Sequence, residues 1–166
     1  MKLYLSLGSN LGDRAKNLQA AIARLAPEVN VIRVSPVYET EPKYKTGQPR
    51  FLNLACLAET KLSALDAFHV VKKIEKEMGR IQTERFSPRV IDIDVLFYES
   101  EKLASTDLTI PHPRLSERAF VLVPLCDIAP DFIHPLLHVT MRELLMKLGD
   151  TSLDARRTSE KISCSQ

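Results

Sequence analysis

Two aspartates separated by a single residue are the side chains of this sequence best placed to do chemistry. Asp92 and Asp94 lie in a run of β-branched and aromatic residues, Val90 to Phe97, that predicts a strand. Side chains alternate along a strand, so the two carboxylates share one face with Cα atoms roughly 6.6 Å apart. Burying two like charges at this spacing is costly unless a cation lies between them. Such hard oxygen ligands suit Mg²⁺ when the phosphates of a substrate complete its coordination.

Three arginines close to this pair could bind those phosphates. Arg80, Arg85 and Arg89 precede the aspartates in the sequence, and guanidinium groups match phosphate oxygens in geometry as well as in charge. The alternative is a solvated strand face whose charges protect a sheet edge, with the arginines paired to nearby glutamates. Three arginines that frame two carboxylates favour the docking of a metal–polyphosphate complex over that alternative.

A second group of side chains suits a planar ligand. Phe51 and Asn53 face the same side of one predicted strand, where a ring could stack on a heterocycle and an amide could bind its edge. The alternative is that Phe51 is a core residue and Asn53 contacts a turn. His112 lies on a proline-flanked loop and, with Arg118, could contact phosphate or ribose, or it could cap a backbone carbonyl.

The composition limits the classes of function that the protein can have. The 166 residues, 45% of them hydrophobic, are enough for one domain with a substantial core. No apolar run approaches the roughly 18 residues of a membrane span, and no signal-peptide pattern precedes the first predicted strand. The net charge of +2 gives no general attraction to nucleic acid. Three widely spaced cysteines without a Cys-x-x-Cys motif argue against a disulfide framework or a zinc site and favour the cytoplasm.

The elements that would position these residues follow the order β-α-β-β-α-β. The predicted strands cover residues 2–7, 29–37, 51–60 and 90–98. The predicted helices begin after the capping residues Asp13 and Ser63 and end near Pro27 and Gly79. On the last strand, alternation places four apolar residues opposite the aspartates: Ile91, Ile93, Val95 and Phe97. The order predicts an α+β fold of the ferredoxin-like type, an antiparallel sheet with both helices packed on one face.

The remaining segments complete a single predicted domain over residues 1–148. Residues 39–50 are predicted to form a long loop, and short helices are predicted over 115–123 and from Thr140 to Leu148. The polar segment 149–166 is predicted to be a flexible tail. The face of the sheet opposite the two helices is left for a binding site beneath the long loops.

Six short motifs occur in a characteristic order along residues 2–148. They are Gly8-Ser9-Asn10, Tyr38-x-Thr40, Phe51-Leu52-Asn53, Gly79-Arg80, Pro88-Arg89-x-x-Asp92-Ile93-Asp94 and Pro111-His112. In this order they closely resemble the 6-hydroxymethyl-7,8-dihydropterin pyrophosphokinase family of folate synthesis. The resemblance implies a ferredoxin-like α+β fold, ATP as co-substrate, two Mg²⁺ ions and a pterin. Members of that family transfer the β,γ-pyrophosphoryl group of ATP to the hydroxymethyl oxygen of the pterin and release AMP.

The resemblance also implies roles for individual residues of this sequence. Asp92 and Asp94 would bind the metal ions, and the catalytic arginines Arg80 and Arg89 would hold the transferring group. The nucleotide would contact Glu75, Arg85, Val95, Thr109, His112 and Arg118. The pterin would contact Thr40, Pro42, Lys43, Phe51, Asn53 and Phe120.

The sequence departs from the family pattern at positions that bear on loop dynamics and affinity. Gln82 stands where many relatives have Arg, Phe86 replaces a common Trp, and Ser87 replaces the usual Gly or Ala of the signature. Phe51 stands where some relatives have Tyr. Two other functions remain open, a ferredoxin-like RNA-binding module and another Mg²⁺-dependent Asp-x-Asp transferase. We expect a cytoplasmic monomer that binds small molecules, and neither nucleic acid nor membrane.

Overall fold

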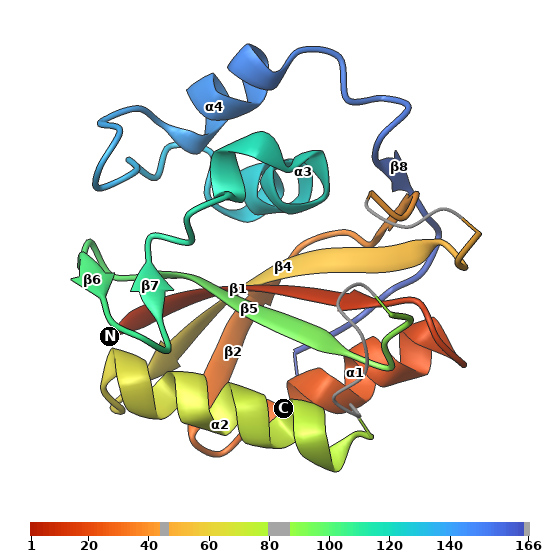
Figure 1. Cartoon of the computed structure of the whole chain (residues 1–166), viewed down its shortest axis with the longest axis horizontal. Coiled ribbons are helices and arrows are strands. Elements are labelled where there is room, and N and C mark those ends of the chain that lie inside the picture. The colour runs from red at the N-terminus through yellow and green to blue at the C-terminus, as the bar shows by residue number, and fades with distance from the viewer. Residues whose placement is uncertain (44–46, 80–86, 165–166) are drawn as a thin grey trace.

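An antiparallel sheet carries the other elements of the molecule (Figure 1). The computed structural model describes residues 1–43, 47–79 and 87–164. The strands of the main sheet are β1 (Lys2–Ser9), β2 (Val29–Val34), β3 (Tyr38–Thr40), β4 (Phe51–Thr60), β5 (Asp92–Tyr98) and β8 (Arg156–Arg157). They pair in the order β5-β1-β4-β3-β8, and β2 also pairs with β4. The prediction of an α+β protein with an antiparallel sheet is confirmed.

Helices cover both faces of this sheet. In Figure 1, α1 (Arg14–Leu25) and α2 (Ala64–Glu77) lie on one face, as the sequence predicts. The opposite face, which the sequence leaves to loops, is covered in part by α3 (Ala119–Ile128) and α4 (Met141–Leu148). The short helix η1 (Leu115–Glu117) precedes α3, and a small hairpin links β6 (Leu103–Ala104) to β7 (Thr109–Ile110). No helix in the described ranges is both long and apolar enough to cross a membrane.

The two core helices begin where their capping residues predict. Asp13 Oδ1 accepts a hydrogen bond from the N–H of Lys16 at 3.1 Å, and Ser63 Oγ accepts one from the N–H of Asp66 at 3.2 Å. These bonds satisfy backbone donors that the first helical turn leaves without partners. The apolar stripe of α1 is fully buried against the sheet: Leu18, Ala21, Ile22 and Leu25.

The strand that bears the aspartates departs from simple alternation at one point. Its register with β1 shifts after Tyr4, and Leu96 is left without a paired residue, as in a β-bulge. Phe97 consequently packs with Tyr4 in the core beneath α3 and α4, whereas Ile93 packs in the core beneath α1 and α2. The prediction that Phe97 shares a face with Ile93 is therefore wrong. The two aspartates precede the bulge and keep the predicted alternation.

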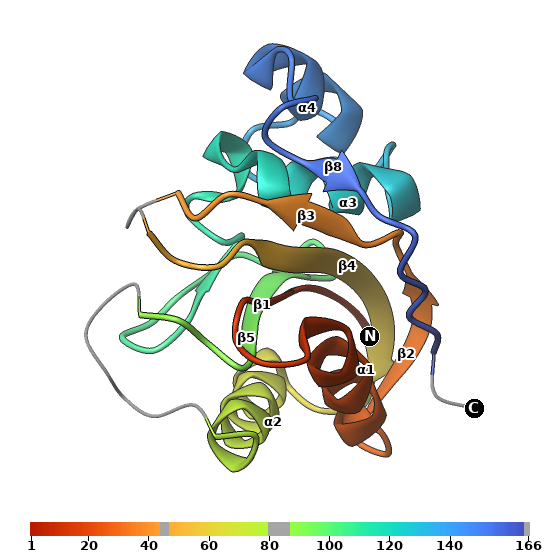
Figure 2. The same ribbon diagram turned by 90° about the vertical axis from the view of Figure 1, so that its right-hand side faces the viewer.

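The segment after Gly149 is attached to the body of the protein, although its composition predicts a flexible tail. Strand β8 pairs with β3 and extends the sheet beside α3 (Figure 2). Farther along, Ser163 and the side chain of Gln19 exchange two hydrogen bonds, both of 3.1 Å. The attachment uses backbone groups, which every sequence carries, so the polar composition gives no sign of it.

One histidine, His134, is buried beside the core beneath α3 and α4. His134 is 5% exposed, and its ring meets Phe97 edge to face at a centroid distance of 5.4 Å. Its Nδ1 accepts hydrogen bonds from the N–H groups of Leu136 and Leu137, at 3.2 and 3.3 Å. Burial, and then the charge of His138, lower the pKa of His134. Folding therefore favours the neutral ring, because a protonated Nδ1 could no longer accept these bonds.

This arrangement predicts a pH-dependent contribution to stability. The stabilisation from neutral His134 is complete above the pKa of the unfolded residue, about 6.5, and is lost as the pH falls toward the lower pKa of the folded state. His134→Gln keeps a hydrogen-bond acceptor but does not titrate. We therefore expect the melting temperature of this variant to fall less between about pH 7.5 and 5.5 than that of the native protein. Thermal unfolding followed by circular dichroism measures the melting temperatures. Equal slopes of melting temperature against pH for the two proteins would contradict the prediction.

Candidate functional site

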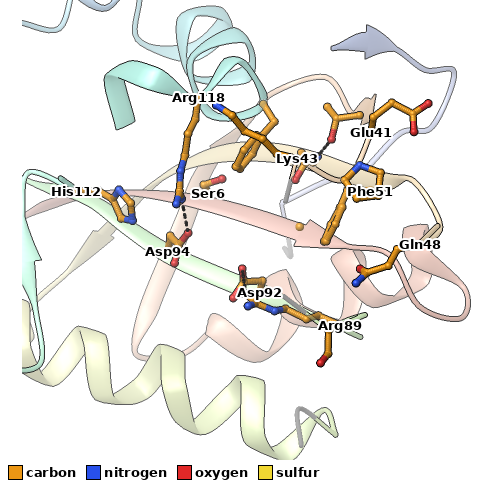
Figure 3. Close-up of a pocket in the computed structure, with 16 residues that line it drawn as sticks. Ser6, Glu41, Lys43, Gln48, Phe51, Arg89, Asp92, Asp94, His112 and Arg118 are labelled. Atoms are coloured by element: carbon orange, nitrogen blue, oxygen red, sulfur yellow. Dashed lines mark hydrogen bonds and ion pairs between the residues drawn. The ribbon is translucent and has the colours of Figure 1, made fainter. Parts of the chain in front are cut away.

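A cleft of about 280 Å³ lies beside the central strands, on the side of the sheet that faces α3 (Figure 3). Strand β1 and the aspartate strand β5 line one part of it, and β4 with the segment after β3 lines the other. The lining residues are Ser6, Gly8, Thr40, Glu41, Pro42, Lys43, Gln48, Phe51, Asn53, Ser87, Arg89, Asp92, Asp94, His112, Arg118 and Phe120.

The two aspartates lie at one end of this cleft, each beside an arginine. Arg89 Nη1 lies 2.5 Å from Asp92 Oδ2, and Arg118 Nη1 lies 3.9 Å from Asp94 Oδ2 (Figure 3). Arg89 comes from the approach to β5, whereas Arg118 directly precedes α3. Segments that are distant in the sequence therefore place alternating negative and positive groups around the same space.

The carboxylates are held in an unfavourable environment. Burial, and then the negative charge of Asp92, raise the pKa of Asp94, although His112, Lys72 and Arg118 act in the opposite direction. Burial lowers the pKa of His112, so its ring adds little positive charge at neutral pH. A bound cation would relieve the repulsion between the two aspartates.

The donor set fits a magnesium ion that is shared with a phosphate ligand. Among the described residues, no group of three or more His, Cys, Asp or Glu side chains could hold a metal by itself. Two carboxylates alone leave most of an octahedron to water and substrate oxygens, which is the usual arrangement for Mg²⁺ with phosphates. Within the same part of the chain, Arg118 Nε is buried and has no hydrogen-bond partner. A buried donor of this kind fits an anionic ligand in the cleft.

Aromatic rings and a side-chain amide line the other end of the cleft. Asn53 is 4% exposed, and its Nδ2 donates to Thr40 Oγ1 at 2.7 Å, which fixes the orientation of the amide. Phe51 and Phe120 line the same region, and the Arg118 guanidinium lies 5.6 Å from the centroid of the Phe120 ring. These groups can bind the faces and the edge of a planar, polar heterocycle.

Gly8 permits the close contact between β1 and Asn53. A Cβ atom at this position would lie only 2.7 Å from Asn53 Oδ1, which is closer than any normal contact. The sequence marks Gly8 only as part of the Gly8-Ser9-Asn10 motif, and the structure shows that its missing side chain leaves room for the amide.

Asn10 is not among the site residues that the sequence predicts, but it joins two segments that line the cleft. Its Oδ1 accepts from the N–H of Arg89 at 2.7 Å, and its Nδ2 donates to Gln48 Oε1 and the carbonyl of Pro49 at 3.3 and 3.2 Å. The residue is 1% exposed, so these bonds satisfy an otherwise buried amide. Its place in the Gly8-Ser9-Asn10 motif is the one signal that could have identified it.

The structure brings most of the predicted site residues together and leaves three out. Eleven of the predicted site residues line the cleft: Thr40, Pro42, Lys43, Phe51, Asn53, Arg89, Asp92, Asp94, His112, Arg118 and Phe120. Glu75 and Val95 are instead buried, and Thr109 is exposed on β7. The other lining residues, which are not among the predicted site residues, are Ser6, Gly8, Glu41, Gln48 and Ser87. Arg80, Arg85, Gln82 and Phe86 lie outside the described residues.

Fold and site together define an α+β protein with a cleft whose lining suits a metal-associated anion at one end and a planar ligand at the other. The family model described as 7,8-dihydro-6-hydroxymethylpterin-pyrophosphokinase (HPPK) matches residues 4–130. The chain is 43% identical over 155 residues to the 2-amino-4-hydroxy-6-hydroxymethyldihydropteridine pyrophosphokinase of Methylorubrum extorquens, covering 92% of this chain and 97% of that protein. The chain belongs to the 7,8-dihydro-6-hydroxymethylpterin-pyrophosphokinase family.

Other relatives are much longer proteins. The chain is 44% identical over 146 residues to the folic acid synthesis protein FOL1 of Dictyostelium discoideum, and 46% identical over 147 residues to fol1 of Schizosaccharomyces pombe. These matches cover 88% and 87% of this chain but only 22% and 20% of the two relatives, so the chain spans about a fifth of their length. A crystal structure of wild-type Plasmodium falciparum HPPK-DHPS has the same fold, with a TM-score of 0.71 at 18% identity over 91% of this chain and 45% of that one.

The electrostatics of the cleft predict that one aspartate destabilises the ligand-free protein. We expect Asp94→Asn to raise the melting temperature in the presence of a chelator, because the substitution removes a half-buried charge that faces Asp92. Each kcal/mol of relieved repulsion should add roughly 2–4 °C for a domain of this size. Differential scanning calorimetry measures the change, with Asp131→Asn, on a side chain that is 82% exposed, as the control. A lower melting temperature for Asp94→Asn would show that the native charge is stabilising.

Proposed function

We propose that this chain transfers the β,γ-pyrophosphoryl group of ATP to the hydroxymethyl oxygen of 6-hydroxymethyl-7,8-dihydropterin, giving the pterin diphosphate and AMP. The observation that carries the proposal is a single cleft with a carboxylate–arginine end and an aromatic–amide end. Membership of the family, and a pyrophosphokinase relative that the chain matches over 97% of its length, support it.

The carboxylate–arginine end would bind MgATP. Asp92 and Asp94 are the groups that would hold Mg²⁺, and two ions are expected from the family resemblance. When bound, the metal supplies positive charge to the phosphate oxygens and lowers the pKa of the acceptor hydroxyl. Arg89 and Arg118 would neutralise the remaining charge, with the buried Arg118 Nε as a ready donor to a phosphate oxygen. Pyrophosphoryl transfer depends mainly on such positioning and charge neutralisation.

The aromatic–amide end would bind the pterin. Its bicyclic ring would lie between Phe51 and Phe120, and the Asn53 amide and the backbone near Thr40, Pro42 and Lys43 would bind its polar edge. The hydrogen bond from Asn53 to Thr40 orients the amide before the ligand arrives, which reduces the entropy lost on binding. We infer that no side chain acts as a dedicated base, because a metal ion held by Asp92 and Asp94 would itself lower the pKa of the hydroxymethyl group.

We also infer that the βαββαβ core is of the ferredoxin-like type. The order β5-β1-β4, with β2 and β3 beyond β4 and both core helices on one face, supports this arrangement. Residues 1–148 would form the pyrophosphokinase domain, acting as a cytoplasmic monomer on small molecules. The net charge of +2 favours no nucleic-acid partner.

Phosphorus NMR of ATP and hydroxymethyldihydropterin with the protein tests the reaction directly. We expect AMP and a pterin diphosphate as products, and the formation of ADP would refute the proposal. Asp94→Ala should lower the rate by roughly 10³-fold or more, because it removes a ligand of the charge-neutralising metal. Asp131→Ala serves as the exposed control, and circular dichroism checks that both variants are folded.

Gly8→Ala should weaken pterin binding selectively. The added methyl group would displace the Asn53 amide, and we expect the KM for the pterin to rise about 10-fold or more while the KM for ATP changes little. If the effect acts through Asn53, Gly8→Ala combined with Asn53→Ala should be no worse than Asn53→Ala alone. Unchanged pterin kinetics in the single variant would show that the amide is not part of the pterin site.

A further inference from the structure

The strand that carries the aspartates lies at one end of the sheet. Strand β5 pairs with β1 on its inner side, and in the described part of the chain no strand of that sheet pairs with its outer side. Backbone groups on the outer side therefore need partners from elsewhere, because a buried N–H or C=O without a hydrogen bond is costly. Farther along the strand, the N–H of His112 meets this need by donating to the carbonyl of Leu96 at 3.0 Å.

Between the two aspartates, the partners are side chains of helix α2. The N–H of Ile93 donates to Glu75 Oε1 at 2.6 Å, and the carbonyl of Ile93 accepts from Lys72 Nζ at 3.0 Å. One acidic and one basic side chain thus take the place of a neighbouring strand. They do so at the residue that separates Asp92 from Asp94.

The two side chains also stabilise each other. Lys72 Nζ lies 3.1 Å from both carboxylate oxygens of Glu75, and it lies 5.5 Å from the centroid of the Phe68 ring. Glu75 is 2% exposed, and a carboxylate buried to this extent requires a cationic partner to remain charged. A charged acceptor forms a stronger hydrogen bond with the Ile93 N–H than a neutral one would.

Helix α2 is a rigid support for this pair. Its neighbouring residues Ala67, Val71 and Ile74 are buried in the core beneath the sheet, so the helix cannot shift without disturbing that packing. The oxygens of Glu75 are directed to the strand and to Lys72, and Glu75 does not line the cleft. The family resemblance implies that Glu75 contacts the nucleotide, whereas its observed partners suggest a different role.

We propose that Lys72 and Glu75 are positioning residues that hold Asp92 and Asp94 at the spacing needed to bind the metal. This role rests on the proposed function of the cleft. Two like-charged side chains tend to separate, and a strand held on only one side can yield to that force. Fixing the Ile93 backbone from the outer side opposes the separation at the midpoint between the carboxylates. Groups that hold metal ligands in this way typically contribute about 10–100-fold to metal affinity or activity.

Glu75→Gln and Lys72→Met test the proposal in the full chain. We expect the Mg²⁺ concentration for half-maximal activity to rise about 10–100-fold in each variant, with a lower kcat and an unchanged KM for the pterin. Lys72→Arg should recover part of the loss, because it restores the positive charge beside Glu75. Lys73→Met is the matched control, since Lys73 is the next residue of the same helix, is 74% exposed and pairs only loosely with Glu77 at 3.9 Å.

A measurement of metal binding without turnover distinguishes this positioning role from direct contact with the nucleotide and from a purely structural role. Electron paramagnetic resonance of free Mn²⁺, in the presence of a non-hydrolysable ATP analogue, should show weaker binding in Glu75→Gln, and no further weakening when that change is added to Asp94→Ala. Unchanged Mn²⁺ binding with an altered KM for ATP would overturn the proposal in favour of direct nucleotide contact. If all kinetic constants worsened by the same factor and the melting temperature fell in parallel, the role of the pair would be purely structural, and the proposal would be overturned. Failure of the native protein to form AMP would refute the proposed function alone, because the Mn²⁺ comparison does not depend on turnover.

Discussion

The repulsion between two half-buried carboxylates on an edge strand is the constraint around which the cleft is organised. Burial and the charge of Asp92 raise the pKa of Asp94, so the ligand-free protein holds a pair of groups that oppose each other. Arg89 and Arg118 each face one member of the pair and offset part of the repulsion. The ligand-free protein thus keeps an unfavourable arrangement of charges. A bound cation would offset the two carboxylates, and a polyphosphate would offset the arginines. Such local instability is common where binding or catalysis requires it.

The central strand β1 determines how far the two ends of the cleft are from each other. Gly8 is paired with Asp92 on one side and with Asn53 on the other. Neighbouring strands lie about 4.8 Å apart, so the backbones that carry the acidic and the amide groups are separated by roughly 10 Å. An acceptor bound at one end would lie beside phosphates bound at the other, and this proximity follows from the sheet itself. Gly8 contributes by leaving the space between them free of a side chain.

Two networks outside the reacting region hold these ends in place. Asn10 links the approach to Arg89 with the segment around Gln48, and it uses both its amide nitrogen and its amide oxygen to do so. On the outer side of β5, Lys72 and Glu75 form hydrogen bonds with the carbonyl and the N–H of Ile93. Both networks join segments that lie far apart in the sequence, and both consist of buried or partly buried hydrogen bonds. They connect the stability of the fold to the geometry of the carboxylates and arginines.

Local patterns in the sequence were sufficient to predict the helix starts at Asp13 and Ser63, the antiparallel α+β class and the shared face of Asp92 and Asp94. The helix starts and the shared face depend on a capping hydrogen bond or a side-chain period within a few residues, and the fold class follows from the order of the elements so identified. The bulge that moves Phe97 to the other core, the pairing of β8 with β3 and the burial of Glu75 were decided by tertiary structure. These features depend on backbone groups and on partners many residues away, to which a local pattern carries no reference. The roles of Arg80 and Arg85 remain predictions from the sequence, while the cleft around Asp92 and Asp94 exists only because the sheet brings β1, β4 and β5 together.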